Sequence, residues 1–352
     1  MEQQILAKKD ENHGESRSAA GQASALLILD DLHVTFRTAA GEAVHAVNGV
    51  TLELKRGEVL GLVGESGSGK SVTCMSILRL LPANARIDGS VRFDGQDVVG
   101  MDSGDLRRFR AGEARMIFQD PTSSLNPLMR VGDQIVESIG SRRRLPSGRA
   151  RRQAIDMLTR VGIAEAERRF NAYPHELSGG MLQRVMIAMA LVVSPKLLIC
   201  DEPTTALDVT TEAQILELIR DLNREFGTSV IFTTHDLGLV RELCDRVVVM
   251  YAGRIAETAE TEACLQSPWH PYTTLLLGAE PESAPEGDRR LRVIEGSPPR
   301  PTDNISGCPF HPRCPLVEER CINQVPPAMP VLEGREHLAA CWVTVERGPM
   351  SV

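Results

Sequence analysis

The segment GESGSGKS at residues 64–71 has residue types and a spacing that can bind phosphate groups. It follows an apolar run at residues 59–63 that predicts a strand, and the residues after it predict a helix. Glycines let the backbone wrap closely around an anion, so that successive N–H groups and the helix N-terminus point toward it. Lys70 would contact phosphate oxygens, and Ser71 would supply a ligand to Mg²⁺. The sequence therefore predicts a nucleotide-phosphate site made of Gly64, Glu65, Ser66, Gly67, Ser68, Gly69, Lys70 and Ser71.

Two adjacent carboxylates follow a second apolar run, KLLIC at residues 196–200. Neighbouring residues at the end of a strand can point in different directions, so Asp201 and Glu202 can have different roles. Asp201 would hold the Mg²⁺ shell, while Glu202 would polarise the water that attacks the γ-phosphate. Taken alone, the pair could also be an acidic helix cap. Together with the phosphate loop, it favours a hydrolytic site.

A second potential anion site lies in LSGGMLQR, which begins at Leu177. Ser178, Gly179 and Gly180 precede a long apolar run that has no proline until Pro195. A hydroxyl and unobstructed N–H groups at a helix N-terminus can bind an anion, as in the phosphate loop. The chain thus has two such helix starts, more than a hundred residues apart.

The elements that must position these residues follow from the apolar patterns. Short β-type runs fill residues 26–62, the sequence between Pro121 and Pro195 is mostly helical, and apolar strands then alternate with helices. Strand–helix alternation predicts a parallel sheet covered on both faces. After Gln266 prolines become frequent and the helical pattern fades. We predict an N-terminal tail (1–25), an α/β domain (26–266) with a helical subdomain near 120–195, and a C-terminal extension (267–352).

Composition and charge restrict the function classes. The chain has 352 residues, of which 42% are hydrophobic and 24% charged, as in soluble globular proteins. A formal net charge of -8 argues against nucleic acid as a partner. No window approaches the roughly 20 apolar residues that span a bilayer, and the polar tail lacks the apolar segment of a signal peptide. We expect a cytoplasmic protein that reaches a membrane only through partners.

The phosphate loop, the Asp-Glu pair, LSGG and the segment TTHD at residues 233–236 together resemble the nucleotide-binding subunit of an ATP-binding cassette (ABC) transporter. The resemblance spans roughly residues 26–266. It implies an α/β fold with a P-loop NTPase core, an antiparallel β subdomain and a helical subdomain. It also implies ATP as the substrate, Mg²⁺ as the cofactor and ATPase activity coupled to transport.

The same resemblance assigns roles to further residues. Gln119 in MIFQDP resembles the family's Q-loop glutamine, which reaches Mg²⁺ and the water and begins the segment that touches the transmembrane subunits. His235 resembles the switch histidine that contacts the γ-phosphate. Asp208 belongs to a segment, Ala206–Asp208, that resembles the D-loop across the dimer seam.

The family usually stacks adenine on an aromatic residue N-terminal to the phosphate loop. Phe36 is the nearest candidate, but Val44 or His45 could take its place.

In the family, the LSGG helix of one subunit caps the γ-phosphate held by the phosphate loop of the other. Ser178, Gly179 and Gly180 would therefore serve the nucleotide of a second ATPase subunit, either a copy of this chain or, preferably, a related one. The resemblance also implies two transmembrane permease subunits and, indirectly, an extracytoplasmic substrate-binding protein. It places the protein peripherally at the cytoplasmic face of the inner membrane.

The C-terminal segment narrows the resemblance to the ATPase subunits of dipeptide/oligopeptide importers, whose C-terminal extension carries a four-cysteine motif. The cysteines here are Cys308, Cys314, Cys321 and Cys341, and the resemblance implies a [4Fe–4S] site at these positions. Four thiolates in a short tail also suit zinc, or they remain free or partly oxidised. The absence of a C-x2-C knuckle weakens the zinc interpretation.

The sequence thus predicts the ATP-hydrolysing subunit of a bacterial importer of di- and oligopeptides. Importers of nickel, glutathione or glycosides share the resemblance, because cargo crosses through other subunits. A soluble ABC ATPase of DNA repair or translation is a competing class. Such proteins need long coiled-coil or zinc-finger insertions or two cassettes in one chain, and about 75 residues between Gln119 and Pro195 leave no room for an arm.

Overall fold

The computed structural model describes residues 25–142, 145–205, 207–279, 293–303, 305–332 and 336–350. The predicted N-terminal tail lies outside these residues except for Ala25, which begins the first strand. Ala206 of the predicted D-loop lies outside them as well.

A four-stranded antiparallel sheet forms from the N-terminal β-type runs. Its strand order is β2 (Ala43–Lys55), β1 (Ala25–Arg37), β4 (Ala85–Phe93) and β5 (Gln96–Asp97). Alternating leucines and valines of β1 and β2 are buried, while polar residues between them are more exposed, as expected for a sheet with one covered face. This sheet shares a hydrophobic cluster with helix α1 (Lys70–Ile77).

The core sheet has eight strands, and the five from β9 to the edge strand β6 pair in parallel. Its order is β11 (Met329–Pro330), β12 (Leu338–Ala339), β10 (Arg254–Glu260), β9 (Arg246–Tyr251), β3 (Val59–Val63), β8 (Ser229–Thr234), β7 (Leu197–Asp201) and β6 (Ala114–Ile117). Every residue of β3, β7 and β8 is buried, as is typical of parallel strands with both faces covered. Their carboxyl ends meet at one edge.

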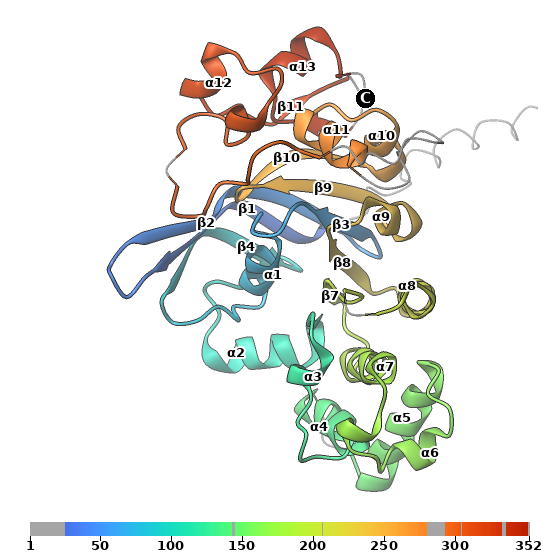
Figure 1. Cartoon of the computed structure of the whole chain (residues 1–352). Coiled ribbons are helices and arrows are strands. Elements are labelled where there is room, and N and C mark those ends of the chain that lie inside the picture. The colour runs from blue at the N-terminus through green and yellow to red at the C-terminus, as the bar shows by residue number, and fades with distance from the viewer. Residues whose placement is uncertain are drawn as a thin grey trace, which may run out of the picture.

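The helical part of the chain lies at one end of the molecule, shown in green in Figure 1. Its hydrophobic cluster includes Ile135, Leu158 and Val185, one from each of its three longest helices. The helices here are α3 (Pro121–Ser124), α4 (Val131–Arg142), α5 (Ser147–Arg160), α6 (Ala166–Arg169), η2 (Pro174–Glu176) and α7 (Gly179–Leu191). The preceding α2 (Ser103–Arg108) and π-helix η1 (Phe109–Glu113) instead place Leu106 and Phe109 in the hydrophobic cluster of the antiparallel sheet.

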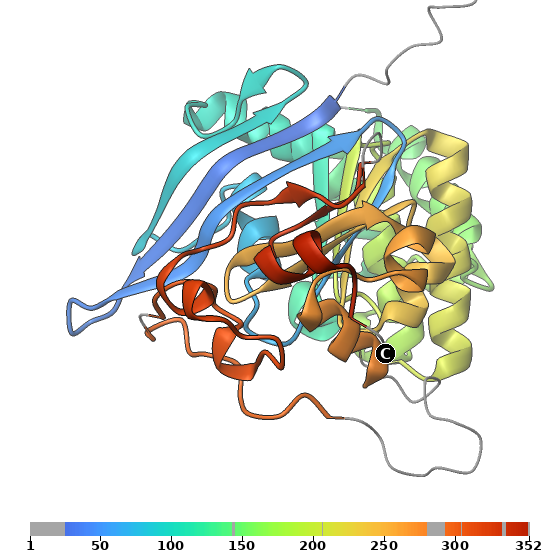
Figure 2. The ribbon, with the colours of Figure 1, turned by 90° about the horizontal axis from the view of Figure 1, so that it is seen from above.

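The C-terminal extension lies at the opposite end from the helical part (Figure 1) and adds strands to the core sheet. Strand β12 pairs with β10, and the two lie side by side in Figure 2. Beyond the core helices α8 (Val209–Phe226) and α9 (Leu237–Leu243), the C-terminal helices are α10 (Thr261–Gln266), α11 (Pro271–Gly278), η4 (His311–Arg313), α12 (Glu319–Asn323) and α13 (Trp342–Arg347).

A buried carboxylate fastens the extension to the core. Glu257 of β10 has no exposed surface and accepts hydrogen bonds from the N–H groups of Trp269 and His270. His337 of the extension lies 2.7 Å from the same carboxylate. A buried charge needs such partners, so this junction holds the extension in a defined place.

The predicted combination of an α/β core, an antiparallel β subdomain and a helical subdomain is confirmed. No helix within the described ranges is both long and apolar enough to cross a membrane.

Candidate nucleotide-binding and hydrolysis site

The phosphate loop joins strand β3 to helix α1, as the sequence predicts. Gly64 and Gly69 have positive φ angles of 150° and 103°. A Cβ atom on Gly69 would lie 2.8 Å from the carbonyl oxygen of Ala46, and one on Gly64 would clash with the carbonyl oxygen of Met250. Glycine is therefore required at both positions by conformation and by space.

Inside the loop, Lys70 is nearly surrounded by oxygen atoms. Its side chain is 4% exposed, and Nζ donates to the carbonyl oxygens of Gly64 at 2.6 Å and Glu65 at 3.2 Å. Burial lowers the pKa of Lys70, while nearby Glu202 and Asp201 act in the opposite direction. The buried hydroxyl of Ser68 has no hydrogen-bond partner among the described residues. A cation and a free donor in a glycine-lined loop fit the anionic triphosphate of a nucleotide.

The expected Mg²⁺ ligands Ser71 and Asp201 lie side by side. Ser71 Oγ donates to Asp201 Oδ1 at 2.9 Å, and Thr233 Oγ1 donates to the same oxygen at 2.8 Å. A hydroxyl and a carboxylate are ligands that Mg²⁺ prefers. With Mg²⁺ bound, this pair would hold the ion, which neutralises phosphate charge.

Glu202 lies at the centre of the remaining predicted residues. Gln119 Nε2 donates to Glu202 Oε2 at 3.3 Å, His235 Nδ1 lies 3.9 Å from that oxygen, and Lys70 Nζ lies 3.7 Å from Oε1. The Glu202 backbone has a φ of 47°, an uncommon conformation for a non-glycine residue. Its N–H donates to Oγ1 of Thr233 at 3.0 Å.

Sequence reasoning missed Thr205 and Thr233, which orient these carboxylates. Thr205 Oγ1 donates to Glu202 Oε2 at 3.1 Å, and Thr233 contacts both Asp201 and the Glu202 backbone. Their positions carried a signal, because Thr205 follows the Asp-Glu pair closely and Thr233 begins TTHD.

The LSGG residues lie at a helix N-terminus that is exposed and has no side-chain cap. Ser178 is the N-cap of α7, its side chain makes no capping hydrogen bond, and Ser178 and Gly179 are exposed. Asp208 instead caps α8: its carboxylate accepts from Thr211 N–H at 3.0 Å, and this contact lowers the pKa of Asp208. Within the described part of the chain, no hydrogen bond links Ser178, Gly179 or Asp208 to the phosphate loop.

The adenine-site candidates lie on different faces of the β1–β2 hairpin. Phe36 pairs with Val44, whereas His45 pairs with Thr35, so the two candidate faces are opposite. Phe36 packs against the same cluster as Val72, the residue after Ser71 of the phosphate loop.

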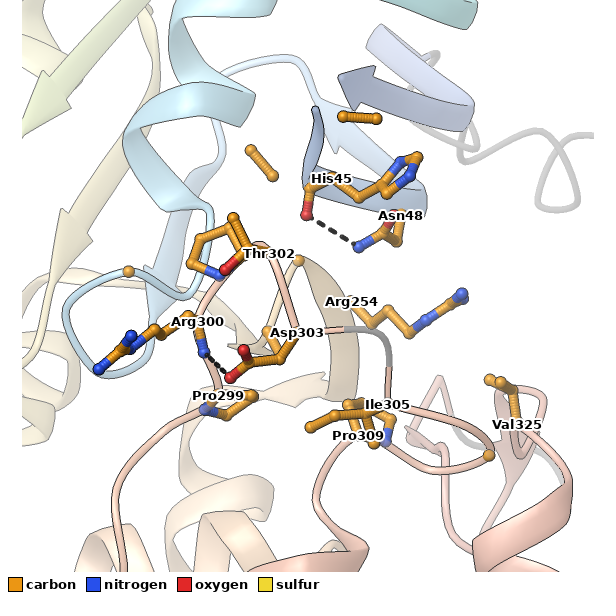
Figure 3. A pocket seen from close by; sticks show the side chains of 17 residues that line it. His45, Asn48, Arg254, Pro299, Arg300, Thr302, Asp303, Ile305, Pro309 and Val325 are labelled. Atoms are coloured by element: carbon orange, nitrogen blue, oxygen red, sulfur yellow. Dashed lines mark hydrogen bonds between the residues drawn. The ribbon is translucent and has the colours of Figure 1, made fainter. Parts of the chain in front are cut away.

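His45 is one of the residues that line a cavity of about 320 Å³ between the hairpin, Gly67 and the extension (Figure 3). Phe36 does not line this cavity. Arg300, Thr302 and Asp303 of the extension also line this cavity. The carboxylate of Asp303 accepts a hydrogen bond from the backbone N–H of Arg300 at 2.8 Å.

The four C-terminal cysteines line one small cavity together with Phe310 and Trp342, and none forms a disulfide. Burial raises the pKa of Cys308 to about 11 and that of Cys314 to about 12. Among the described residues, no three His, Cys, Asp or Glu side chains have an arrangement that could hold a metal ion.

The fold and the site define an ATP-binding cassette ATPase. Residues 47–205 match the ABC transporter family, and residues 256–321 match the oligopeptide/dipeptide transporter C-terminal region. The chain belongs to the family of ABC transporter ATP-binding proteins that carry this C-terminal region.

Named relatives match nearly the whole chain. The oligopeptide transport ATP-binding protein OppD of Escherichia coli is 48% identical over 93% of this chain and 96% of its own length. A probable peptide ABC transporter ATP-binding protein of Sinorhizobium fredii is 47% identical over 91% of this chain and 96% of its own length. A solved dimeric bacterial ABC transporter cassette, MJ0796, has a TM-score of 0.60 and 29% identity, over 67% of this chain and 98% of that one.

Proposed function

We propose that this protein is the ATPase subunit of an importer for di- and oligopeptides. The observation that carries the hydrolytic part is the position of the Glu202 carboxylate, which contacts Gln119 and lies near both Lys70 and His235. The cargo is inferred from the relatives, which are named for oligopeptide and peptide transport.

In the proposed reaction, Glu202 orients the attacking water and withdraws its proton. Gln119 and Thr205 both donate a hydrogen bond to Oε2 of Glu202 and hold its carboxylate in place. Lys70 leaves the loop carbonyls to contact the β- and γ-phosphates, and His235 contacts the γ-phosphate. Ser71 and Asp201 bind Mg²⁺, and Phe36 is the residue proposed to contact adenine.

The open helix start at Ser178, Gly179 and Gly180 supports a composite site. We infer that these groups cap the γ-phosphate bound by a second ATPase subunit, a copy of this chain or a related one. Asp208 would lie at the same seam. The solved cassette MJ0796 is a dimer, which is the arrangement this inference requires.

A membrane permease pair is the proposed docking partner, with an extracytoplasmic binding protein supplying cargo. The residue before Gln119 and a residue in the segment after it expose large apolar side chains, Phe118 at 39% and Leu128 at 86%. Exposed apolar side chains of this size favour a protein contact. The protein would then lie peripherally at the cytoplasmic face of the inner membrane.

The four cysteines are proposed to bind a [4Fe–4S] cluster, with zinc as the alternative. The convergence of four thiols on one cavity supports the donor set. Ligation would require the thiols to lose their protons and move closer together. Iron and sulfide analysis of protein purified without air, with the visible absorbance spectrum, tests the cluster, and zinc in place of iron favours the alternative.

Reconstitution tests the proposed function. The chain is purified together with the permeases that it binds, and uptake of labelled di- and oligopeptides into vesicles is measured with ATP on the cytoplasmic side. Peptide uptake that stops in Glu202→Gln supports the proposal. Uptake of nickel, glutathione or a glycoside instead would reassign the cargo, and ATPase stimulation by DNA with none by permeases would contradict transport.

A further inference from the structure

Arg313 of the C-terminal extension is buried against the phosphate loop. Its side chain is 5% exposed. Nη1 donates to Glu65 Oε2 at 2.7 Å, and Nη2 donates to Glu65 Oε1 at 3.2 Å. Two parallel hydrogen bonds between an arginine and a carboxylate are the strong and directional form of this contact. The extension therefore reaches a residue of the nucleotide site.

The Arg313 guanidinium is held in place by further groups around it. Nε donates to the carbonyl oxygen of Glu295 at 3.0 Å, and Nη2 donates to that of Ile294 at 3.3 Å. Nη1 also contacts the Tyr251 hydroxyl at 3.3 Å. Because these contacts fix the side chain, little conformational freedom is lost in holding Glu65.

Each polar part of Glu65 is engaged by a different neighbour. The carboxylate accepts from Arg313, and the N–H donates to the Tyr272 hydroxyl at 2.9 Å. The carbonyl oxygen accepts from Lys70 Nζ at 3.2 Å. One residue thus joins the extension to the lysine that contacts phosphate.

A second contact joins the extension to the same region. The carbonyl oxygen of Pro301 accepts from the N–H of His45 at 3.2 Å, and Pro301 lines the cavity of Figure 3 together with Gly67 of the phosphate loop. The extension therefore touches the surroundings of the loop at two separate places.

We propose that Arg313 is a positioning residue for ATP, through which the C-terminal extension sets the affinity of the phosphate loop for nucleotide. The proposal rests on ATP binding at this loop. Arg313 acts in two ways: it fixes the loop at Glu65, and it neutralises a carboxylate that would otherwise repel the triphosphate.

The test measures MgATP affinity of the full-length chain by titration calorimetry, together with KM and kcat. Arg313→Gln is expected to raise the dissociation constant and KM about tenfold, because it leaves Glu65 unpaired. The kcat at saturating ATP is expected to change less than about twofold. Arg320→Gln is the matched control, since Arg320 pairs with Glu346 inside the extension, and it should bind ATP like the parent.

A double variant separates the proposed role from loss of packing. Glu65→Gln together with Arg313→Gln removes the unpaired carboxylate, so its ATP affinity should lie closer to that of the parent than does Arg313→Gln alone. A merely structural arginine would give no such rescue.

Two results would overturn the proposal: unchanged ATP affinity in folded Arg313→Gln, or no rescue in the double variant. If Arg313→Gln does not fold, Arg313→Lys replaces it, because lysine keeps the charge but cannot make the two parallel hydrogen bonds to Glu65. Parent-like ATP affinity in folded Arg313→Lys overturns the proposal. A parent chain that binds no ATP at all would instead contradict the proposed function.

Discussion

The phosphate loop and the LSGG segment are both glycine- and serine-containing helix starts, but their surroundings differ. At the phosphate loop, Lys70 is buried and hydrogen-bonded to loop carbonyls, and Glu65 is held by Arg313 and Tyr272. At the start of α7, Ser178 is exposed and its side chain makes no capping bond. The first region is assembled within one chain, whereas the second presents its donors outward.

This difference indicates a division of work. The phosphate loop can bind a nucleotide in the absence of a partner subunit. Contacts within the chain already order the loop, so little conformational entropy is lost when the nucleotide binds. Exposed donors at a helix N-terminus are solvated until an anion displaces the water. The comparison therefore predicts that binding needs the first region, and hydrolysis needs both.

Glu202→Gln should have the largest effect, a fall in kcat of at least about a hundredfold, because the amide cannot accept the proton from water. ATP binding and ATP-dependent dimerisation should persist, since the phosphate loop and LSGG segment are unchanged. Phosphate release and sedimentation velocity with ATP measure the two properties. Hydrolysis near the parent rate would refute Glu202 as the base.

Ser178→Arg should lower the hydrolysis rate about a hundredfold by removing a donor and blocking the approach of the partner. Nucleotide affinity of the isolated subunit should stay unchanged, because Ser178 does not touch its own phosphate loop. Ser147→Arg, at the exposed start of α5, is the control. A loss of nucleotide affinity in the isolated Ser178→Arg subunit, measured by equilibrium titration, would contradict the separate roles of the two regions.

Gly69→Ala should weaken ATP binding about tenfold and destabilise the fold by about 1–2 kcal/mol, because its φ of 103° and the nearby Ala46 carbonyl leave no place for a methyl group. Gly140→Ala in α4 is the control, as its added Cβ meets no atom within 4 Å. Urea denaturation and calorimetry measure both quantities. Equal behaviour of the two variants would show that the loop is not preassembled.

Acid should also weaken the packing at His270 that supports the phosphate loop through Tyr272. His270 Nδ1 accepts from Tyr272 N–H, and burial lowers the pKa of His270 to about 4 from its ordinary 6.5. Between these two values the unfolded chain binds more protons, so stability falls as pH falls from 6.5 toward 4, by up to about 3 kcal/mol. Urea midpoints of the parent and His270→Asn measure this, and an identical pH slope in both would refute it.

The fold, and the contacts between residues at the carboxyl ends of parallel strands, could be predicted from the sequence. Lys70 follows one apolar strand and Asp201 ends another, so a parallel sheet must place them at one edge. The Arg313–Glu65 contact was not predictable, because 248 residues separate the two and no periodic pattern relates them. The pairing of the extension with the core sheet was not predictable either, because its strands are only two residues long and too short to give an alternating pattern.

Mixing two inactive chains tests the central claim most directly. Lys70→Ala lacks a working phosphate loop and Ser178→Arg lacks a working LSGG segment, so neither should hydrolyse ATP alone. A mixed pair contains one site with both parts intact. We predict that ATPase activity appears on mixing and rises with the concentration of both chains. Activity of Ser178→Arg alone at the parent rate, or a mixture no more active than its components, would contradict a site shared between two copies of this chain.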